Sequence, residues 1–109
     1  MKIYISGPIS GLDLNERRLD FEAAQVALEE MGHTVFNPMR NGLPSEAPTA
    51  DHMRRDIEAL LHCDAIMMLR RWNHSAGCKL ELDVAVAIGL QVFFEEAQYV
   101  EKSKTIKFE

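Results

Sequence analysis

One acidic side chain, Glu81, is the residue of this chain best placed to carry out chemistry. It lies in a segment from about residue 77 to residue 88 whose apolar spacing predicts a helix. At about 100° per residue, Glu81 falls on the side occupied by Val84 and Ala85, whereas Asp83 faces solvent. A buried carboxylate is costly unless it is paired or hydrogen-bonded, so an inward glutamate is a candidate catalytic group. A structural glutamate bonded to a neighbouring loop fits the pattern equally well.

Short apolar runs alternating with amphipathic segments define the elements that position Glu81. The predicted strands are 2–6, 34–36, 64–69 and 91–94, and the predicted helices are 15–31, 49–62 and 77–88. Strands that alternate with helices at this spacing are typical of βαβ units and a parallel sheet. We therefore predict a small α/β domain with three layers, flavodoxin-like or Rossmann-like, with about four parallel strands in the order 2-1-3-4.

The size and charge of the chain limit the classes of function. The 109 residues fit a single domain, 1–109, with a charged tail from about residue 95. A net charge of −5 without a basic stripe argues against binding to a nucleic acid duplex. The N-terminal apolar run is too short for a signal peptide, and no stretch approaches the roughly 20 apolar residues of a membrane span. We expect a soluble, cytoplasmic protein with no membrane partner.

The cysteines and histidines give no sign of a cofactor. Cys63 and Cys78 are too few and too far apart for a disulfide framework or a zinc site, and both are expected to be buried thiols. The four histidines show no metal-ligand spacing and are expected on the surface or in loops. We therefore expect no metal and no cofactor.

The predicted sheet determines where a ligand would bind. In such a sheet, ligands bind beyond the carboxyl ends of the strands, here between the first and third strands, where the strand order reverses. Loops 7–14 and 70–75 meet there, and Asn37 ends the second strand at the same edge. Glycines in the first loop let backbone N–H groups approach a ligand closely. The candidate binding residues of this loop are Gly7, Pro8, Ile9, Ser10 and Gly11.

Further candidates lie around the second and third helices. Ser75 and Gly77 begin the third helix, where free N–H groups and the helix dipole favour an anion, although Ser75 serves equally well as an N-cap. Trp72, in the loop before Ser75, is a candidate to cover a bound ligand or stack on it, and packing of its own loop is the alternative. Asp56 lies on the flank of the apolar face of the second helix, where an ordinary surface aspartate is the alternative.

These residues also carry a resemblance to a known family. The matching pattern is Tyr4-Ile-Ser-Gly7-Pro-Ile-Ser-Gly11, then Asn37-Pro38, Asp56 and Ser75-Ala-Gly77-Cys-Lys-Leu-Glu81. It resembles the nucleoside 2-deoxyribosyltransferase-like superfamily, in particular small uncharacterised bacterial and phage members and the 2′-deoxynucleoside 5′-phosphate N-hydrolases. The similarity covers about residues 2–94, and the Ser-x-Gly-x-x-x-Glu element is its most specific part.

The resemblance implies cleavage or transfer at the N-glycosidic bond of (deoxy)nucleosides or their 5′-phosphates. The residue at the Glu81 position is the family's nucleophile at the anomeric carbon, and the aspartate at the Asp56 position handles the proton of the departing base. A tyrosine matched by Tyr4 lies against the nucleophile. In the hydrolase branch, the serine matched by Ser75 and the glycine-rich loop hold the 5′-phosphate.

The chain departs from the family in two places. The hydrolases have an arginine where this chain has Ser10, so one expected phosphate contact has no counterpart at that position. Family sites are often completed by C-terminal residues of a neighbouring subunit, and we expect a homo-oligomer, a dimer or larger. The candidates for that role are Lys102, Ser103 and Lys104, and Tyr99 is a candidate interface residue. The polar loop 39–48, expected to be a mobile flap, is expected to form the base pocket.

The pattern leaves several alternatives open. Hydrolysis and transfer share a first half-reaction, so the sequence does not separate them. A non-catalytic nucleotide- or sugar-nucleotide-binding module would use the same crevice, and an acidic structural partner protein would open no crevice beside Gly7. For catalysis, burial must not protonate Glu81, and a hydrogen bond from Tyr4 is the natural remedy if Tyr4 faces the third helix.

Overall fold

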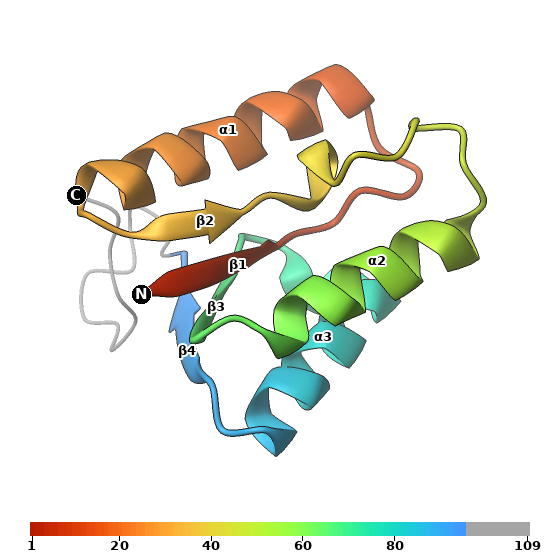
Figure 1. Ribbon diagram of the computed structural model, residues 1–109. Coiled ribbons are helices and arrows are strands. Elements are labelled where there is room, and N and C mark those ends of the chain that lie inside the picture. Colours follow the sequence, from red (N-terminus) through yellow and green to blue (C-terminus); the bar gives the residue numbers. More distant parts are fainter. Residues whose placement is uncertain (96–109) are drawn as a thin grey trace.

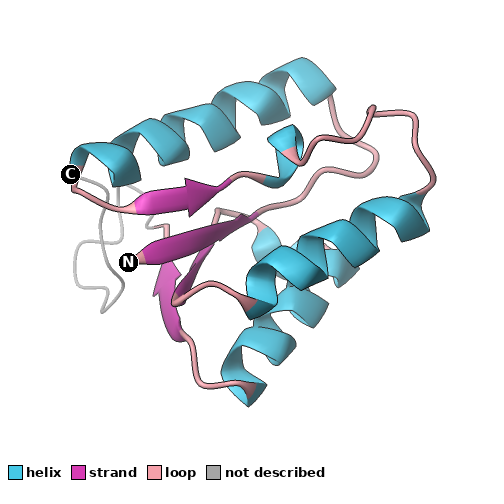
Figure 2. Cartoon of the chain, viewed as in Figure 1, coloured by secondary structure: helices cyan, strands magenta, loops and turns pink. Residues whose placement is uncertain are grey.

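A computed structural model describes residues 1–95 as a parallel sheet between two layers of helices (Figures 1 and 2). The strands are β1 (Lys2–Ser6), β2 (Thr34–Phe36), β3 (Ala65–Met68) and β4 (Gln91–Phe94). The helices are α1 (Leu14–Glu30), α2 (Thr49–Leu61) and α3 (Ala76–Ala87), with short 3₁₀ turns η1 (Pro38–Arg40) and η2 (Trp72–His74). The expectations for Tyr99, Lys102, Ser103 and Lys104 lie outside the described residues.

The predicted sheet order is confirmed. The four strands run parallel in the order β2-β1-β3-β4, with Tyr4 of β1 opposite Phe36 of β2 and Ile66 of β3. From β1 the chain continues to β2 on one side of the sheet, and from β3 it continues to β4 on the other side, so the strand order reverses between β1 and β3. The carboxyl ends of those two strands therefore form one edge at which the following loops diverge.

Two apolar clusters, one on each face of the sheet, hold the three layers together. Alternate residues of a strand face opposite sides, and β1 follows this rule closely. On one face, Ile3 and Ile5 pack against Phe21 of α1. On the other face, Tyr4 packs in the cluster that also contains Leu60 of α2. The side chain of Tyr4 therefore faces the layer of α2 and α3, as the proposed contact with the third helix requires.

Local capping signals explain where the helices begin. The side chain of Asp13 accepts hydrogen bonds from the backbone of the first turn of α1, and Ser75 accepts one from the backbone N–H of Cys78 in α3. Gly32, at φ +95°, follows the end of α1 in the left-handed conformation that glycine tolerates. Within residues 1–95, no helix is long and apolar enough to cross a membrane.

Loop 39–48, which the sequence predicts to be a mobile flap, begins with a 3₁₀ turn and is hydrogen-bonded to its neighbours. Its first residues belong to η1, whose start is capped by Asn37 through a hydrogen bond from the backbone N–H of Met39. Asn41 is buried and ties the middle of the loop to α2. The loop is thus anchored on both sides before α2 begins.

Candidate active site

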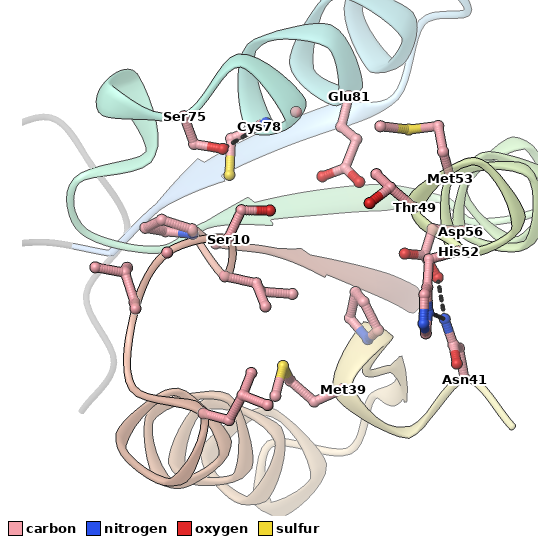
Figure 3. Close-up of a pocket in the computed structure, with 18 of the residues that line it drawn as sticks. Ser10, Met39, Asn41, Thr49, His52, Met53, Asp56, Ser75, Cys78 and Glu81 are labelled. Carbon is pink, nitrogen blue, oxygen red and sulfur yellow. Dashed lines mark hydrogen bonds between the residues drawn. The ribbon is translucent and has the colours of Figure 1, made fainter. Parts of the chain in front are cut away.

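Glu81 lies at the bottom of a cavity at the carboxyl edge of β1 and β3, with its carboxylate directed inward (Figure 3). Only 9% of the surface of Glu81 is exposed to solvent. The Tyr4 hydroxyl donates to Oε2 at 2.8 Å, and the Ser6 hydroxyl donates to Oε1 at 2.5 Å. Tyr4 and Ser6 are two residues apart on β1, so both point to the face that α3 covers. Each carboxylate oxygen of Glu81 therefore has its own donor.

The surroundings of Glu81 set its proton affinity near neutrality. Burial raises the pKa of Glu81 to about 7, and the charge of Asp56 adds to the rise. The hydrogen bonds from Ser6 and Tyr4 lower this pKa because they stabilise the ionised form. Burial, with the charge of Glu81, raises the pKa of Tyr4 well above 10, so its hydroxyl remains a donor. Both protonation states of Glu81 are therefore accessible near pH 7.

The cavity beside Glu81 has a volume of about 870 Å³, which is in the range of small-molecule sites. All five candidate residues of the first loop, Gly7 to Gly11, line it, together with Ser75, Gly77 and Asp56. Gly7 is closely packed against the core, because a Cβ added at this position would lie 2.9 Å from Leu69 Cδ1. The loops that the sequence predicted to meet at this edge thus surround one space.

Residues 38–48 and α2 form another part of the cavity lining. Pro38, Met39, Leu43 and Ala47 provide an apolar surface, and Met53 of α2 adds to it. Asp56, also on α2, is 9% exposed and lines the cavity. Burial raises the pKa of Asp56, and the hydrogen bond from Asn41 opposes that rise. The cavity therefore holds two carboxyl groups in different surroundings, with Glu81 and Asp56 on different helices.

Two of the residues predicted to bind a ligand lie outside the lining of the cavity. Asn37 is buried, where its amide donates to Gln25 Oε1 and accepts from the backbone of Met39, so it acts as a cap within the fold. Trp72 packs with Phe94 of β4 at a ring separation of 5.7 Å. Both side chains lie at the predicted edge of the sheet but turn toward neighbouring elements instead of the cavity, and their binding roles stay predictions.

Some residues of the cavity lining are suited to an anion. The first turn of α3 contributes backbone N–H groups at Gly77 and Cys78, although the N–H of Cys78 is already bonded to Ser75 Oγ at 3.2 Å. The arginines of the lining are Arg18 and Arg71. Neither occupies the position of Ser10, where the hydrolases carry their arginine. Within residues 1–95, no group of histidine, cysteine, aspartate and glutamate side chains is arranged to hold a metal ion.

Comparison of the sequence with models of known protein families identifies one family. The model of the family described as Domain of unknown function (DUF4406) matches residues 1–94. The chain belongs to this DUF4406 family. Because the match ends at Phe94, the last residue of β4, the family model spans the whole sheet and every residue assigned to the cavity. No curated protein sequence matches the chain.

Solved structures with the same fold come from nucleoside-processing enzymes. A 2-deoxyribosyltransferase from Bacillus psychrosaccharolyticus superposes with a TM-score of 0.70 at 22% identity, covering 100% of this chain and 86% of that chain. A 2-deoxyribosyltransferase from Leishmania mexicana gives 0.65 at 21% identity, covering 95% and 71%. A CMP N-glycosidase from Clostridium botulinum gives 0.63 at 18% identity, covering 95% and 75%. The DUF4406 chain therefore has the fold of the nucleoside 2-deoxyribosyltransferase-like superfamily.

Sequence reasoning missed three polar residues of this site. Ser6 was detectable, because it is two residues after Tyr4 on the same strand and shares its face. Asn41 and His52 were not: Asn41 lies in a loop without periodicity, and His52 was expected on the surface or in a loop. His52 is instead half-buried on α2 and lines the cavity.

Proposed function

We propose that this DUF4406 protein cleaves or transfers at the N-glycosidic bond of a (deoxy)nucleoside or its 5′-phosphate, with Glu81 as the nucleophile. The observation that carries the proposal is the setting of Glu81: a buried carboxylate, held at both oxygens by Tyr4 and Ser6, at the bottom of a nucleotide-sized cavity. Hydroxyl donors fix the orientation of the carboxylate without a neutralising cation. Such a group is suited to attack on carbon.

The reaction follows from the two carboxyl groups. An oxygen of ionised Glu81 forms a bond to the anomeric carbon while the N-glycosidic bond breaks and its electron pair goes to the base. Protonated Asp56 gives its proton to the base nitrogen, which leaves Asp56 ionised. Water or a second base then attacks the anomeric carbon, the bond to Glu81 breaks, and the proton of the attacking group goes to ionised Asp56, which is the two-step logic of retaining glycosidases.

The structural neighbours support this class of chemistry. Two of them are 2-deoxyribosyltransferases and the third is a CMP N-glycosidase, so the same fold serves both outcomes of the shared intermediate. The anion-suited lining around Ser75, Arg18 and Arg71 favours a 5′-phosphate on the substrate of this chain. The homo-oligomer expected from the resemblance stays a prediction, which light scattering of the full chain tests.

Incubation of the protein with a panel of deoxynucleosides and deoxynucleotides, with and without an acceptor base, tests the proposal. We expect chromatography to show base release, base exchange or both, with the 5′-phosphates preferred. Glu81→Ala and Glu81→Gln should each reduce the rate by at least about a thousandfold, because the nucleophile is lost.

Asp83→Asn is the matched control, because Asp83 is an exposed carboxylate on the same helix. This variant should leave the rate unchanged. Near-normal base release by either Glu81 variant would refute the assignment of the nucleophile.

The alternative function is a non-catalytic nucleotide- or sugar-nucleotide-binding module. It is favoured by the pKa of about 7 for Glu81, because a protonated carboxyl binds a hydroxyl group but does not attack carbon. This alternative predicts that a nucleotide raises the unfolding temperature and is recovered unchanged after long incubation. Recovery of free base from the same sample would exclude it.

A further inference from the structure

Asn41 lies between Asp56 and His52 and hydrogen-bonds both (Figure 3). Its Nδ2 lies 3.0 Å from Oδ1 of Asp56 and 3.0 Å from Nδ1 of His52. Its Oδ1 accepts the backbone N–H of Leu43 at 3.0 Å, and its carbonyl accepts Nε of Arg55 at 3.0 Å. Asn41 is buried, so the side-chain amide finds its donors and acceptors inside the protein.

The backbone N–H of Leu43 fixes which way round the Asn41 amide lies. A flipped amide would place its NH₂ group against that N–H, so that two donors would face each other. With Oδ1 held by Leu43, the NH₂ group must point toward Asp56 and His52. Asn41 therefore acts as a donor to both.

The same reasoning fixes the form of His52. Its Nε2 lies 3.0 Å from the carbonyl oxygen of Pro44, which only accepts, so Nε2 carries a proton. Its Nδ1 faces the NH₂ group of Asn41, which only donates, so Nδ1 has its lone pair free. In this arrangement Nε2 of His52 donates to Pro44, and its Nδ1 accepts one of the two hydrogens of the Asn41 amide.

This arrangement gives the two carboxyl oxygens of Asp56 different hydrogen-bonding surroundings. Oδ1 accepts a hydrogen bond from Asn41, so it cannot at the same time point a proton at that donor. The other oxygen, Oδ2, points toward the interior of the cavity, and no side chain within residues 1–95 hydrogen-bonds it. A proton on Asp56 is therefore best placed on Oδ2.

We propose, on the basis of the proposed function, that Asn41 and His52 are positioning residues for Asp56: His52 holds the Asn41 amide, the amide binds Oδ1, and the transferable proton of Asp56 is thereby directed through Oδ2 at the departing base. The proton goes from Oδ2 to the base nitrogen as the N-glycosidic bond breaks. Asp56 is left ionised, with the hydrogen bond from Asn41 stabilising the new charge.

Two substitutions of His52 separate this role from a structural one. In His52→Asn, the amide oxygen replaces Nδ1 as acceptor for Asn41, whereas the donor to Pro44 is lost. In His52→Gln, the longer side chain keeps a donor for Pro44 but lacks the acceptor near Asn41. We expect His52→Gln to lower kcat by about tenfold to a hundredfold with little change in KM, because Asp56 loses its orientation. His52→Asn, as the conservative rescue, should stay within about threefold of the unmodified protein.

A second measurement does not depend on catalysis. Carbon-13 NMR of the Asp56 carboxyl follows its titration in the unmodified protein, in both His52 variants and in Asn41→Asp, which keeps the acceptor for Leu43 but lacks the donors. Losing the donor raises the pKa of Asp56, and the negative charge that the substitution adds beside Oδ1 raises it further, so we expect a rise of about one unit or more in Asn41→Asp. His52→Gln should shift the titration in the same direction, and His52→Asn should not.

The outcomes distinguish the inference from the proposed function. If the unmodified protein releases no base but the Asp56 titrations follow the expected order, the proposed function fails and the positioning of Asp56 stands. Equal effects of the two His52 variants on kcat and on the titration would overturn the inference, as would an unchanged titration in Asn41→Asp. If His52→Gln does not fold, as judged by circular dichroism, the titration of Asp56 in Asn41→Asp tests the inference instead.

Discussion

The hydroxyl of Ser6, at the end of β1, donates to Oε1 of Glu81, on α3, across 2.5 Å. This contact joins the strand that carries the glycine-rich loop to the helix that carries the proposed nucleophile. Because Ser6 immediately precedes Gly7, the position of the loop and the orientation of the carboxylate depend on the same few atoms of β1. The site is therefore organised from the central strand outward.

The first prediction concerns the pH dependence of activity. Reaction requires ionised Glu81, whose pKa is about 7, and protonated Asp56, so kcat/KM should pass through a maximum: it falls at acid pH, where Glu81 is protonated, and at alkaline pH, where Asp56 is ionised. Ser6→Ala removes a donor that lowers the pKa of Glu81, so the rise should move to higher pH by about one unit. Profiles of kcat/KM from pH 5 to 9 measure both effects.

Asp83→Asn serves as the control for the pH profile, because it removes an exposed carboxylate from the same helix without touching Glu81. Its profile should coincide with that of the unmodified protein. A profile of Ser6→Ala that moved to lower pH would show that the hydroxyl does not stabilise the ionised carboxylate.

The second prediction concerns stability. The pKa of Glu81 is about 7 in the folded protein against 4.5 for a free glutamate side chain, so the native state holds a proton that the unfolded state loses first. This difference in proton binding contributes to the free energy of unfolding. The contribution is fully present below pH 4.5 and is lost as the pH rises to about 7. The loss is about 3 kcal/mol. Glu81→Gln should not lose it, so its free energy of unfolding relative to the unmodified protein should grow by that amount.

Urea denaturation at pH 4 and pH 8 measures this difference between Glu81→Gln and the unmodified protein. The comparison between two proteins at each pH removes the contributions that other titrating groups, such as Asp56, make to both. A constant difference between the two proteins at both pH values would contradict the raised pKa of Glu81.

The third prediction concerns the glycine-rich loop. In Gly7→Ala, the new methyl group would lie 2.9 Å from Leu69 Cδ1 and 3.0 Å from Phe21 Cζ, both in the core. This overpacking should lower the free energy of unfolding by about 1–3 kcal/mol. Gly77→Ala is the matched comparison, because its methyl group meets nothing closer than 3.8 Å and lies in a helix. It should be neutral or stabilising by up to about 1 kcal/mol. Equal losses in the two variants would show that Gly7 is not sterically restricted.

The fourth prediction concerns Arg17, a buried residue of α1. Its Nε donates to the carbonyl oxygen of Pro8 at 2.8 Å, and its guanidinium lies over the ring of Phe21 at 5.6 Å. Arg17→Met leaves the carbonyl of Pro8 without this donor, so we expect a loss of about 1–3 kcal/mol in stability. The loosened loop should also raise KM for the substrate.

The control for Arg17 is Arg54→Met, on the exposed side of α2, where the ion pair with Asp51 is open to solvent. This variant should change stability by less than about 0.5 kcal/mol. Thermal and urea unfolding of both variants, with KM for the best deoxynucleotide, complete the comparison. An Arg17 variant as stable as the Arg54 variant would refute a structural role for the buried guanidinium.

The architecture was readable from the sequence because strands and helices differ in the period of their apolar residues. The sheet order and the strands β1, β2 and β4 agree with the prediction, and β3 is shorter at each end, at Ala65–Met68 instead of 64–69. Glu81 was predicted to be buried from helical periodicity alone, and its exposure of 9% confirms this.

The directions of loop side chains were not readable, because loops lack a period. Asn37 and Trp72 were placed at the correct edge of the sheet, yet their side chains turn to Gln25 and Phe94. The contact of Asn41 with the site was not predictable for the same reason, because it depends on a hydrogen bond to Asp56, 15 residues further along the chain.

By itself, the sequence determined the order of the elements, the edge at which the loops meet and the inward side of α3, because these follow from local spacing along the chain. Only the tertiary structure decided which donors reach Glu81, which oxygen of Asp56 is free and which side chains line the cavity. Those properties depend on distances of about 3 Å between segments far apart in sequence, and such distances are set only when the layers pack.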